Sequence, residues 1–195
     1  MRSRARATLA IAALAFTATA CDGDSPDASH TPGPTSSSGS SSAVPTVSAT
    51  PKPAPPSVPT AATVGLTIPA AEAFARFYLG AVDYLAATGD ANVVRDWSDK
   101  ECAACNALAN AYEQTYKNGG SLSGQFRARI VSVDQVRLIR KDTAAVVIKA
   151  AQGRHQWLKS AGSAPTDLPG GPVTFDMTLA AKDGRWIMYE IVIKK

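Results

Sequence analysis

Two of the three cysteines in this 195-residue chain have a spacing that suggests chemistry. Cys102 and Cys105 lie three residues apart near the start of a predicted helix, where residues at that spacing are close enough for a disulfide. Thiols at a helix N-terminus can also be redox-active, but the strand–helix–strand pattern of a thioredoxin-like site does not precede them. We expect a structural disulfide between Cys102 and Cys105, with a redox pair or a metal site as the alternatives.

The two histidines add little to this chemistry. A zinc site at the cysteine pair would need further Cys or His ligands, and the chain holds only His30 and His155. His155 could act as a general base because its ordinary pKa lies near neutrality. No motif pairs it with a nucleophile, so we expect an exposed residue at a strand end. The sequence therefore predicts neither a metal nor a cofactor.

The third cysteine, Cys21, follows a segment typical of an export signal. Three arginines precede a charge-free run from Ala7 to Ala20, which has the length of a signal-peptide core and is too short to span a bilayer. Because the other two cysteines pair with each other, Cys21 would be an odd exported thiol, and lipidation explains it. We expect a signal peptide at residues 1–20 and a lipidated Cys21 on the outer face of the cytoplasmic membrane. The alternative is a secreted protein cleaved after Ala20.

Residues 21–65 have the composition of a spacer. The segment from Asp22 to Gly65 contains 10 Ser, 9 Pro, 6 Thr and 4 Gly. Such a segment buries too little apolar surface to offset its conformational entropy, so we expect a disordered linker that tethers the next domain.

The charge balance argues against a nucleic-acid binder. The net charge of +4 includes the three arginines of the predicted signal, so the mature chain carries a net charge of +1. A nucleic-acid-binding domain normally shows a strongly basic patch.

Residues 66–195 read as one domain that begins with helices. A first helix is predicted from Thr67 to Thr88, and a short one from Ala91 to Trp97. Ser98 and Glu101 have the spacing of a capping box, which predicts a third helix from there to about Lys117. The residues predicted on the buried face of the first helix are Phe74, Phe77, Tyr78, Ala81 and Leu85.

From Ser121 onward, alternating apolar residues predict an antiparallel sheet. One long strand is expected up to Arg140, a second over 143–151 with an extension toward Lys159, and two more over 173–179 and 185–193. Asp183-Gly184 is a strong hairpin signal, and residues 160–171 read as a polar loop. Ile187, Tyr189, Ile191 and Ile193 are expected on one face of the last strand. Helices followed by strands predict an α+β domain, with the N-terminal helices packed on a curved, cone-like antiparallel sheet.

The element order and the closing segment Lys182–Ile187 resemble the nuclear-transport-factor-2-like (cystatin-related) α+β cone. The domain from Thr67 to Lys195 also resembles a family of uncharacterised actinobacterial lipoproteins. The matching segments are Ala71–Gly80, Gly89-Asp90 and the cysteine pair. These resemblances imply a fold and a location. They imply no activity, because the superfamily includes isomerases, dehydratases, ligand carriers and assembly domains.

A cone of this kind can enclose a pocket. An isomerase of the superfamily would need an inward carboxylate and a hydroxyl donor such as Tyr84 or Tyr112. Asp176 alternates out of phase with its apolar neighbours, so we expect it to face water. Aromatic residues are more often core than pocket; the candidates for a pocket lining are Tyr78, Trp97, Tyr112, Phe126 and Trp157.

Five positive charges lie on one predicted strand and its turn, at Arg127, Arg129, Arg137, Arg140 and Lys141. They could meet anionic lipid headgroups or wall polymers. The alternative, which the sequence favours, is a solvated strand edge protected against aggregation.

These patterns together predict a membrane-anchored, non-catalytic binding or scaffold module outside the cytoplasmic membrane. The alternative is a carrier or sensor of a small apolar ligand in the cone, and an isomerase-like or thiol-redox enzyme is less favoured. The expected partners are the membrane, through the lipid anchor, and an envelope protein or small apolar ligand, with no nucleic acid.

Overall fold

The computed structural model describes residues 52–195. The predicted signal peptide, the lipidation site Cys21 and the spacer up to residue 51 lie outside these residues. The described part contains helices α1 (Thr60–Thr63), α2 (Ile68–Thr88), α3 (Asn92–Arg95) and α4 (Ala103–Lys117). Its strands are β1 (Ser121–Gly124), β2 (Arg129–Arg140), β3 (Thr143–Gln152), β4 (His155–Leu158), β5 (Thr166–Leu168), β6 (Gly171–Lys182) and β7 (Arg185–Lys194). No helix within residues 52–195 is long and apolar enough to cross a membrane.

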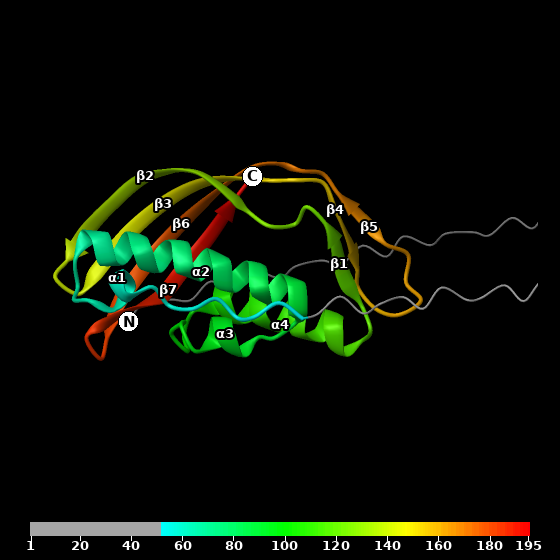
Figure 1. The fold of residues 1–195 in the computed structure, drawn as a ribbon, viewed down its shortest axis with the longest axis horizontal. Helices are drawn as coiled ribbons and strands as arrows, with labels where there is room; N and C mark the ends of the chain where they lie inside the picture. The colour runs from blue at the N-terminus through cyan, green and yellow to red at the C-terminus, as the bar shows by residue number, and fades with distance from the viewer. Residues whose placement is uncertain (1–51) are drawn as a thin grey trace, which may run out of the picture. The chain divides into compact units, whose positions relative to one another are not determined.

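The strands form two antiparallel sheets. The larger sheet has the order β2-β3-β6-β7, and the smaller one has the order β1-β4-β5. Figure 1 shows the larger sheet arching over α2, with α3 and α4 on the same side and the smaller sheet at one end. The predicted α+β architecture, with helices packed on a curved antiparallel sheet, is confirmed.

Helix α2 forms where the sequence predicts it. The Thr67 side chain accepts a hydrogen bond from the Ala70 backbone N–H at 3.3 Å, and proline lies in the first turn. The helix ends at Gly89, whose φ of 71° is left-handed, a conformation that glycine adopts without steric cost. All five residues predicted on its inner face are buried, so α2 forms the centre of the core beneath the sheet.

Helix α4 begins later than the capping-box pattern predicts. Its N-cap is Cys102, whose sulfur accepts a hydrogen bond from the Cys105 backbone N–H at 3.2 Å. The Ser98 hydroxyl, expected as the cap, is bonded to the Val94 carbonyl and lies 2.7 Å from the Tyr78 hydroxyl. The prediction failed because Ser98 satisfies buried polar groups of the core rather than a helix end.

The long first strand and the polar loop were predicted wrongly. The predicted strand is interrupted by a bend between β1 and β2 that begins at Gly124, where φ is 89°. The two segments therefore join different sheets. The expected extension of the second strand is a separate strand, β4, and β5 forms within the predicted loop. A period of two continues across such a bend, which is why the pattern alone does not reveal it.

A bulge changes the inner face of β7. The register shifts between the pairs Thr178↔Glu190 and Leu179↔Met188, which leaves Tyr189 unpaired. Trp186 and Met188 therefore point into the core, whereas Tyr189 is 48% exposed. The predicted single face is wrong at Tyr189, because the extra residue reverses the alternation there. Beyond the bulge, Ile191 and Ile193 lie opposite the inward-facing Met177 and Phe175, as expected.

Residues 52–65, which composition assigns to the spacer, lie on the domain. The Lys52 ammonium is 3.6 Å from the Asp90 carboxylate beyond the end of α2. Ala62 in α1 is buried in the same core as α2. The folded region therefore begins before residue 66, the boundary expected from composition.

The Cys102 and Cys105 sulfurs lie 2.01 Å apart, at bonding distance. We expect the double variant Cys102→Ser/Cys105→Ala to lose about 2 kcal/mol of unfolding free energy, because a short closed loop restricts the unfolded chain by about that amount. The serine keeps an oxygen acceptor at the helix N-cap. Urea unfolding with and without dithiothreitol measures the effect. Reductant should lower the wild-type midpoint and leave the variant unchanged; a wild-type midpoint insensitive to reduction contradicts the prediction.

Candidate functional site

A cavity of about 280 Å³ lies where α2 and α4 meet the bend between the two sheets. Apolar side chains form most of its wall, among them Leu79, Val82, Leu108, Leu122, Val173 and Phe175. A largely apolar hollow with a few polar groups is the usual form of a small-molecule site.

Asp83 carries the acidic group of this cavity. It follows Leu79 by one helical turn, so α2 presents both side chains on the same face. The Asp83 carboxylate accepts a hydrogen bond from the Ala128 backbone N–H at 3.2 Å. Burial raises the pKa of Asp83 to about 6, although the Ala128 hydrogen bond and the charge of Arg127 act in the opposite direction. Asp83 can therefore exchange a proton near neutral pH.

His155 lines the cavity from β4. The expectation of an exposed strand end is wrong, because its side chain is only 7% exposed. The ring Nδ1 lies 3.0 Å from the Gly153 carbonyl oxygen. A carbonyl only accepts hydrogen bonds, so Nδ1 carries the hydrogen and Nε2 of the neutral ring is left as an acceptor.

Tyr112 and Trp157 form an aromatic wall, with ring centroids 6.1 Å apart. The Trp157 indole N–H donates to the Thr115 hydroxyl at 3.1 Å, which fixes the ring. Among residues 52–195 the Tyr112 hydroxyl has no hydrogen-bond partner. Burial, and after it the negative charge of Asp83, raises the pKa of Tyr112, so this hydroxyl stays protonated and can donate.

Two of the five aromatic residues expected in a pocket, Tyr112 and Trp157, line this cavity. Tyr78 is completely buried in the core, and Trp97 packs its ring 5.3 Å from that of Phe77. Phe126 lines a separate surface cleft. Tyr78 and Trp97 lie outside the cavity because they pack within the helical layer and not at the mouth of the cone. Phe126 lies outside it because the bend after Gly124 directs this residue outward.

The strand carboxylates lie elsewhere, including Asp176, which the sequence places in water. Asp176 pairs with Lys194 on the larger sheet, and Asp134 pairs with Lys149. The sequence analysis missed Asp83, although a signal was present: an acidic residue one turn after Leu79 and next to Val82 on an otherwise apolar helix face. Within the described part of the chain, no group of three or more His, Cys, Asp or Glu side chains could hold a metal ion.

The residues of the cavity can therefore serve two roles, ligand binding and proton transfer. Its apolar wall can bury a small ring or chain, and Asp83, Tyr112 and His155 offer a carboxyl group, a donor and an acceptor to a polar substituent. The same carboxyl group could take up a proton from a bound molecule.

Comparison with protein families shows one match. The model of a family of unknown function, DUF6318, matches residues 46–191. No curated protein matches the chain.

Solved structures match the domain at low sequence identity. The intermembrane-space region of the chloroplast protein ARC6 has a TM-score of 0.50 and 11% identity, over 65% of this chain and 95% of that one. A protein with a cystatin-like fold from Caulobacter vibrioides has a TM-score of 0.43 and 11% identity, over 65% and 88% of the two chains. An NTF-2-like protein of unknown function from Shewanella oneidensis has a TM-score of 0.37 and 12% identity, over 63% and 93%. Likeness at these identities concerns the fold alone.

Proposed function

We propose that this chain, which belongs to the DUF6318 family of unknown function, is a lipid-anchored protein whose domain binds a small, largely apolar ligand outside the cytoplasmic membrane. The ligand carries at least one polar group, which faces Asp83 and Tyr112. In this proposal the domain is a carrier or sensor module.

The cavity is the observation that carries the binding role. Its volume of about 280 Å³ suits a ligand of one or two rings. Its wall is built by side chains from both sheets and from two helices, and Asp83, Tyr112 and His155 reach it from three different elements. A scaffold domain has no need of a half-buried carboxylate facing a hollow, because burying part of a charged group without an ion-pair partner destabilises the fold.

The membrane location rests on the sequence. The charge-free run before Cys21 and the Ser- and Pro-rich segment after it support export and tethering. Two acyl chains on one cysteine would hold the protein stably on the bilayer.

The binding role is tested with 2-naphthol, an apolar double ring with one hydroxyl, on the chain carrying Cys21→Ser to avoid detergent. We expect 2-naphthol to bind about fivefold more tightly than naphthalene, because one neutral hydrogen bond contributes about 1 kcal/mol. Isothermal titration calorimetry measures both affinities. Equal affinities for the two rings would count against a polar contact with Asp83 or Tyr112.

A matched pair of variants tests whether the ligand binds in this cavity. Ala128→Leu adds a branched side chain to the cavity wall, whereas Ala145→Leu adds the same bulk on β3, where the alternating burial places residue 145 on the other face of the sheet. Ala128→Leu should weaken 2-naphthol binding about tenfold or more, because the added side chain takes up part of the space that the ring needs. Ala145→Leu should leave it unchanged. Similar affinities for both variants would remove the cavity as the site.

The anchor has its own test. Cys21→Ala, expressed with the native leader, should move the protein from the membrane fraction to the medium, because the acylated thiol is lost. Mass spectrometry of the wild-type mature N-terminus should find an acylated Cys21. An unmodified terminus, or wild-type protein free in the medium, contradicts the anchor but leaves the ligand proposal standing.

Asp83 also favours a second candidate, an enzyme that moves a proton on a bound ligand. A general base works best when its pKa lies near the working pH, and burial brings the pKa of Asp83 to about 6. Tyr112 would donate to the oxygen that gains charge. The test is exchange of the α-protons of 2-tetralone for deuterium, followed by NMR. If the wild type accelerates the exchange and the Asp83→Asn variant does not, catalysis is established. If the wild type does not accelerate the exchange, only the carrier role remains.

A further inference from the structure

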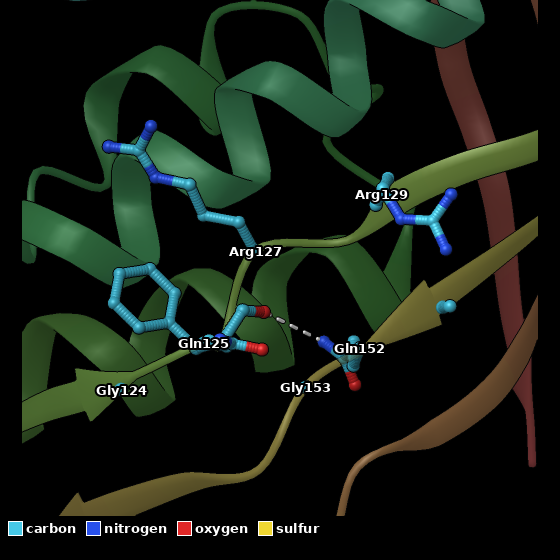
Figure 2. A pocket seen from close by; sticks show the side chains of 8 residues that line it. Gly124, Gln125, Arg127, Arg129, Gln152 and Gly153 are labelled. Carbon is cyan, nitrogen blue, oxygen red and sulfur yellow. Dashed lines mark hydrogen bonds between the residues drawn. The ribbon is translucent and has the colours of Figure 1, made fainter.

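A second hollow lies on the outer side of the bend between the sheets. This cleft has a volume of about 510 Å³ and is lined by Gln125, Phe126, Arg127, Arg129 and Gln152, among others. The Gln152 side-chain amide donates to the Phe126 carbonyl at 3.1 Å, the dashed line in Figure 2. The Gly153 backbone N–H donates to the Gln125 carbonyl at 3.0 Å. These bonds hold the segment at Gln125 and Phe126 against the segment at Gln152 and Gly153, and they fix the floor of the cleft.

The cleft is positively charged and lacks an acidic lining residue. Arg127 and Arg129 are exposed, and within residues 52–195 neither forms an ion pair or a hydrogen bond. Figure 2 shows their side chains extending to opposite sides, with Gln125 and Gln152 below them in this view. Asp83 attracts Arg127 from the cavity side but lies outside the cleft lining. The arrangement suits a ligand with separated negative groups better than one compact ion.

The positive charge continues beyond the cleft. Strand β2 is an edge of the larger sheet and carries Arg137 and Arg140, both exposed, with Lys141 in the turn that follows. None of these three forms an ion pair among the described residues. Arg129 and Arg137 are separated by about 27 Å of strand, at about 3.4 Å per residue. Arginines therefore recur along one sheet edge from the cleft to the turn, on either side of the Asp134–Lys149 ion pair.

We propose that the Arg127–Arg129 cleft and the basic edge of β2 bind a linear anionic polymer, one with phosphate or carboxylate groups repeated along its chain. Guanidinium groups bind both kinds of oxyanion in a bidentate manner. The polymer would lie across the cleft, with one anionic group near Arg127 and another near Arg129. The side-chain amide of Gln125 has no hydrogen-bonding partner among residues 52–195. It can form a hydrogen bond to the polymer between the two anionic groups.

The shape of the site favours a polymer over a membrane surface. A strand of polymer can enter a cleft, whereas a bilayer presents a flat array of headgroups. The sequence analysis favoured solvated edge charges that prevent aggregation. That role requires neither the hollow beside Arg127 and Arg129 nor a run of charges continuing into it.

The test uses inorganic polyphosphate and the Cys21→Ser chain at about 50 mM salt, with affinity measured by calorimetry per phosphate. Arg127→Gln/Arg129→Gln should weaken binding about tenfold and reduce the slope of log affinity against log salt by about two, one for each lost contact. The matched control, Lys100→Gln/Lys159→Gln, removes the same charge from two exposed residues. Lys159 follows β4 at the end that pairs with Ser121, whereas the cleft borders the other end of that pairing, at Gly124. The control should bind within about twofold of the wild type.

Five further outcomes decide the proposal. Binding of poly-γ-glutamate as well would assign the site to oxyanion polymers in general, and binding of polyphosphate alone would assign it to phosphate; both support the proposal. An equal loss in the control variant would mean non-specific charge attraction and overturn it. Orthophosphate binding as tightly per phosphate as the polymer would overturn it in favour of a single-ion site. Binding only to phosphatidylglycerol vesicles would overturn it in favour of the membrane. Thermal unfolding of both variants verifies that they are folded.

Discussion

Asp83→Asn is expected to raise the free energy of unfolding near neutral pH by up to about 3 kcal/mol. Burial raises the pKa of Asp83 from 3.8 to about 6, and each unit of pKa shift corresponds to about 1.4 kcal/mol. The folded state holds the proton more tightly than the unfolded state. The wild-type stabilisation is therefore complete below about pH 4 and is lost as the pH rises through about 6. Asparagine stays neutral, and its amide oxygen can still accept from the Ala128 N–H.

Urea unfolding of wild type and variant near pH 4 and near pH 7.5 measures this effect. The variant should be more stable only at the higher pH, because both side chains are neutral at the lower one. Asp134→Asn is the control, since its exposed carboxylate pairs with Lys149 and the pKa of Asp134 is lowered. That variant should gain nothing at either pH. An Asp83→Asn variant equally stabilised at both pH values would show that the charge of Asp83 is not the cause.

Phe74→Ala is expected to cost about 3–5 kcal/mol of unfolding free energy, the usual range for removing a buried phenyl ring. Phe74 is completely buried on α2. Its ring centroid lies 6.1 Å from those of Phe77 and Tyr78 and 6.0 Å from that of Trp97. The ring thus joins α2 to the segment that follows α3, and its loss leaves a cavity that these neighbours fill only in part.

Equilibrium unfolding in urea measures the loss, with Phe126→Ala as the matched control. Phe126 is half-buried at the surface cleft, so its truncation should cost about 1 kcal/mol. If the two variants lose the same stability, the α2 aromatic cluster is not the centre of the core.

The sequence predicted the elements that local rules determine. Thr67 and Gly89 mark the ends of α2 because a side-chain oxygen at the first position and a left-handed residue at the last satisfy helix ends. Asp183 and Gly184 both adopt positive φ, of 51° and 76°, as a two-residue hairpin turn with twisted strands requires. These features depend on residues close in the chain.

The sequence did not predict features that depend on distant partners. Ser98 has the spacing of a cap, but its hydroxyl is engaged by Tyr78, twenty residues earlier. The bend at Gly124 and the bulge at Tyr189 change which side chains point inward. The alternation of apolar and polar residues in the sequence continues across both and does not reveal them. His155 was expected in water because no motif pairs it with a nucleophile, and it is buried in the smaller sheet.

The candidate site was predicted only in part for the same reason. Tyr112 was named as a hydroxyl donor and Trp157 as a side chain that could line a cone, although aromatic residues are more often core. Asp83 was missed because a single acidic residue on a helix normally faces water, and only the approach of Ala128 from the bend encloses it. The sequence suggested the classes of side chain, and the packing of the bend against α2 decides which of them meet.

Intermolecular NOEs between bound 2-naphthol and the methyl groups of the chain test the ligand-binding cavity most directly. Contacts from the ring protons to the methyls of Leu79, Leu122 and Val173, which line the cavity from three different elements, are the predicted result. NOEs confined to the Phe126 ring and the Ala151 methyl, which line the outer cleft, would contradict the account.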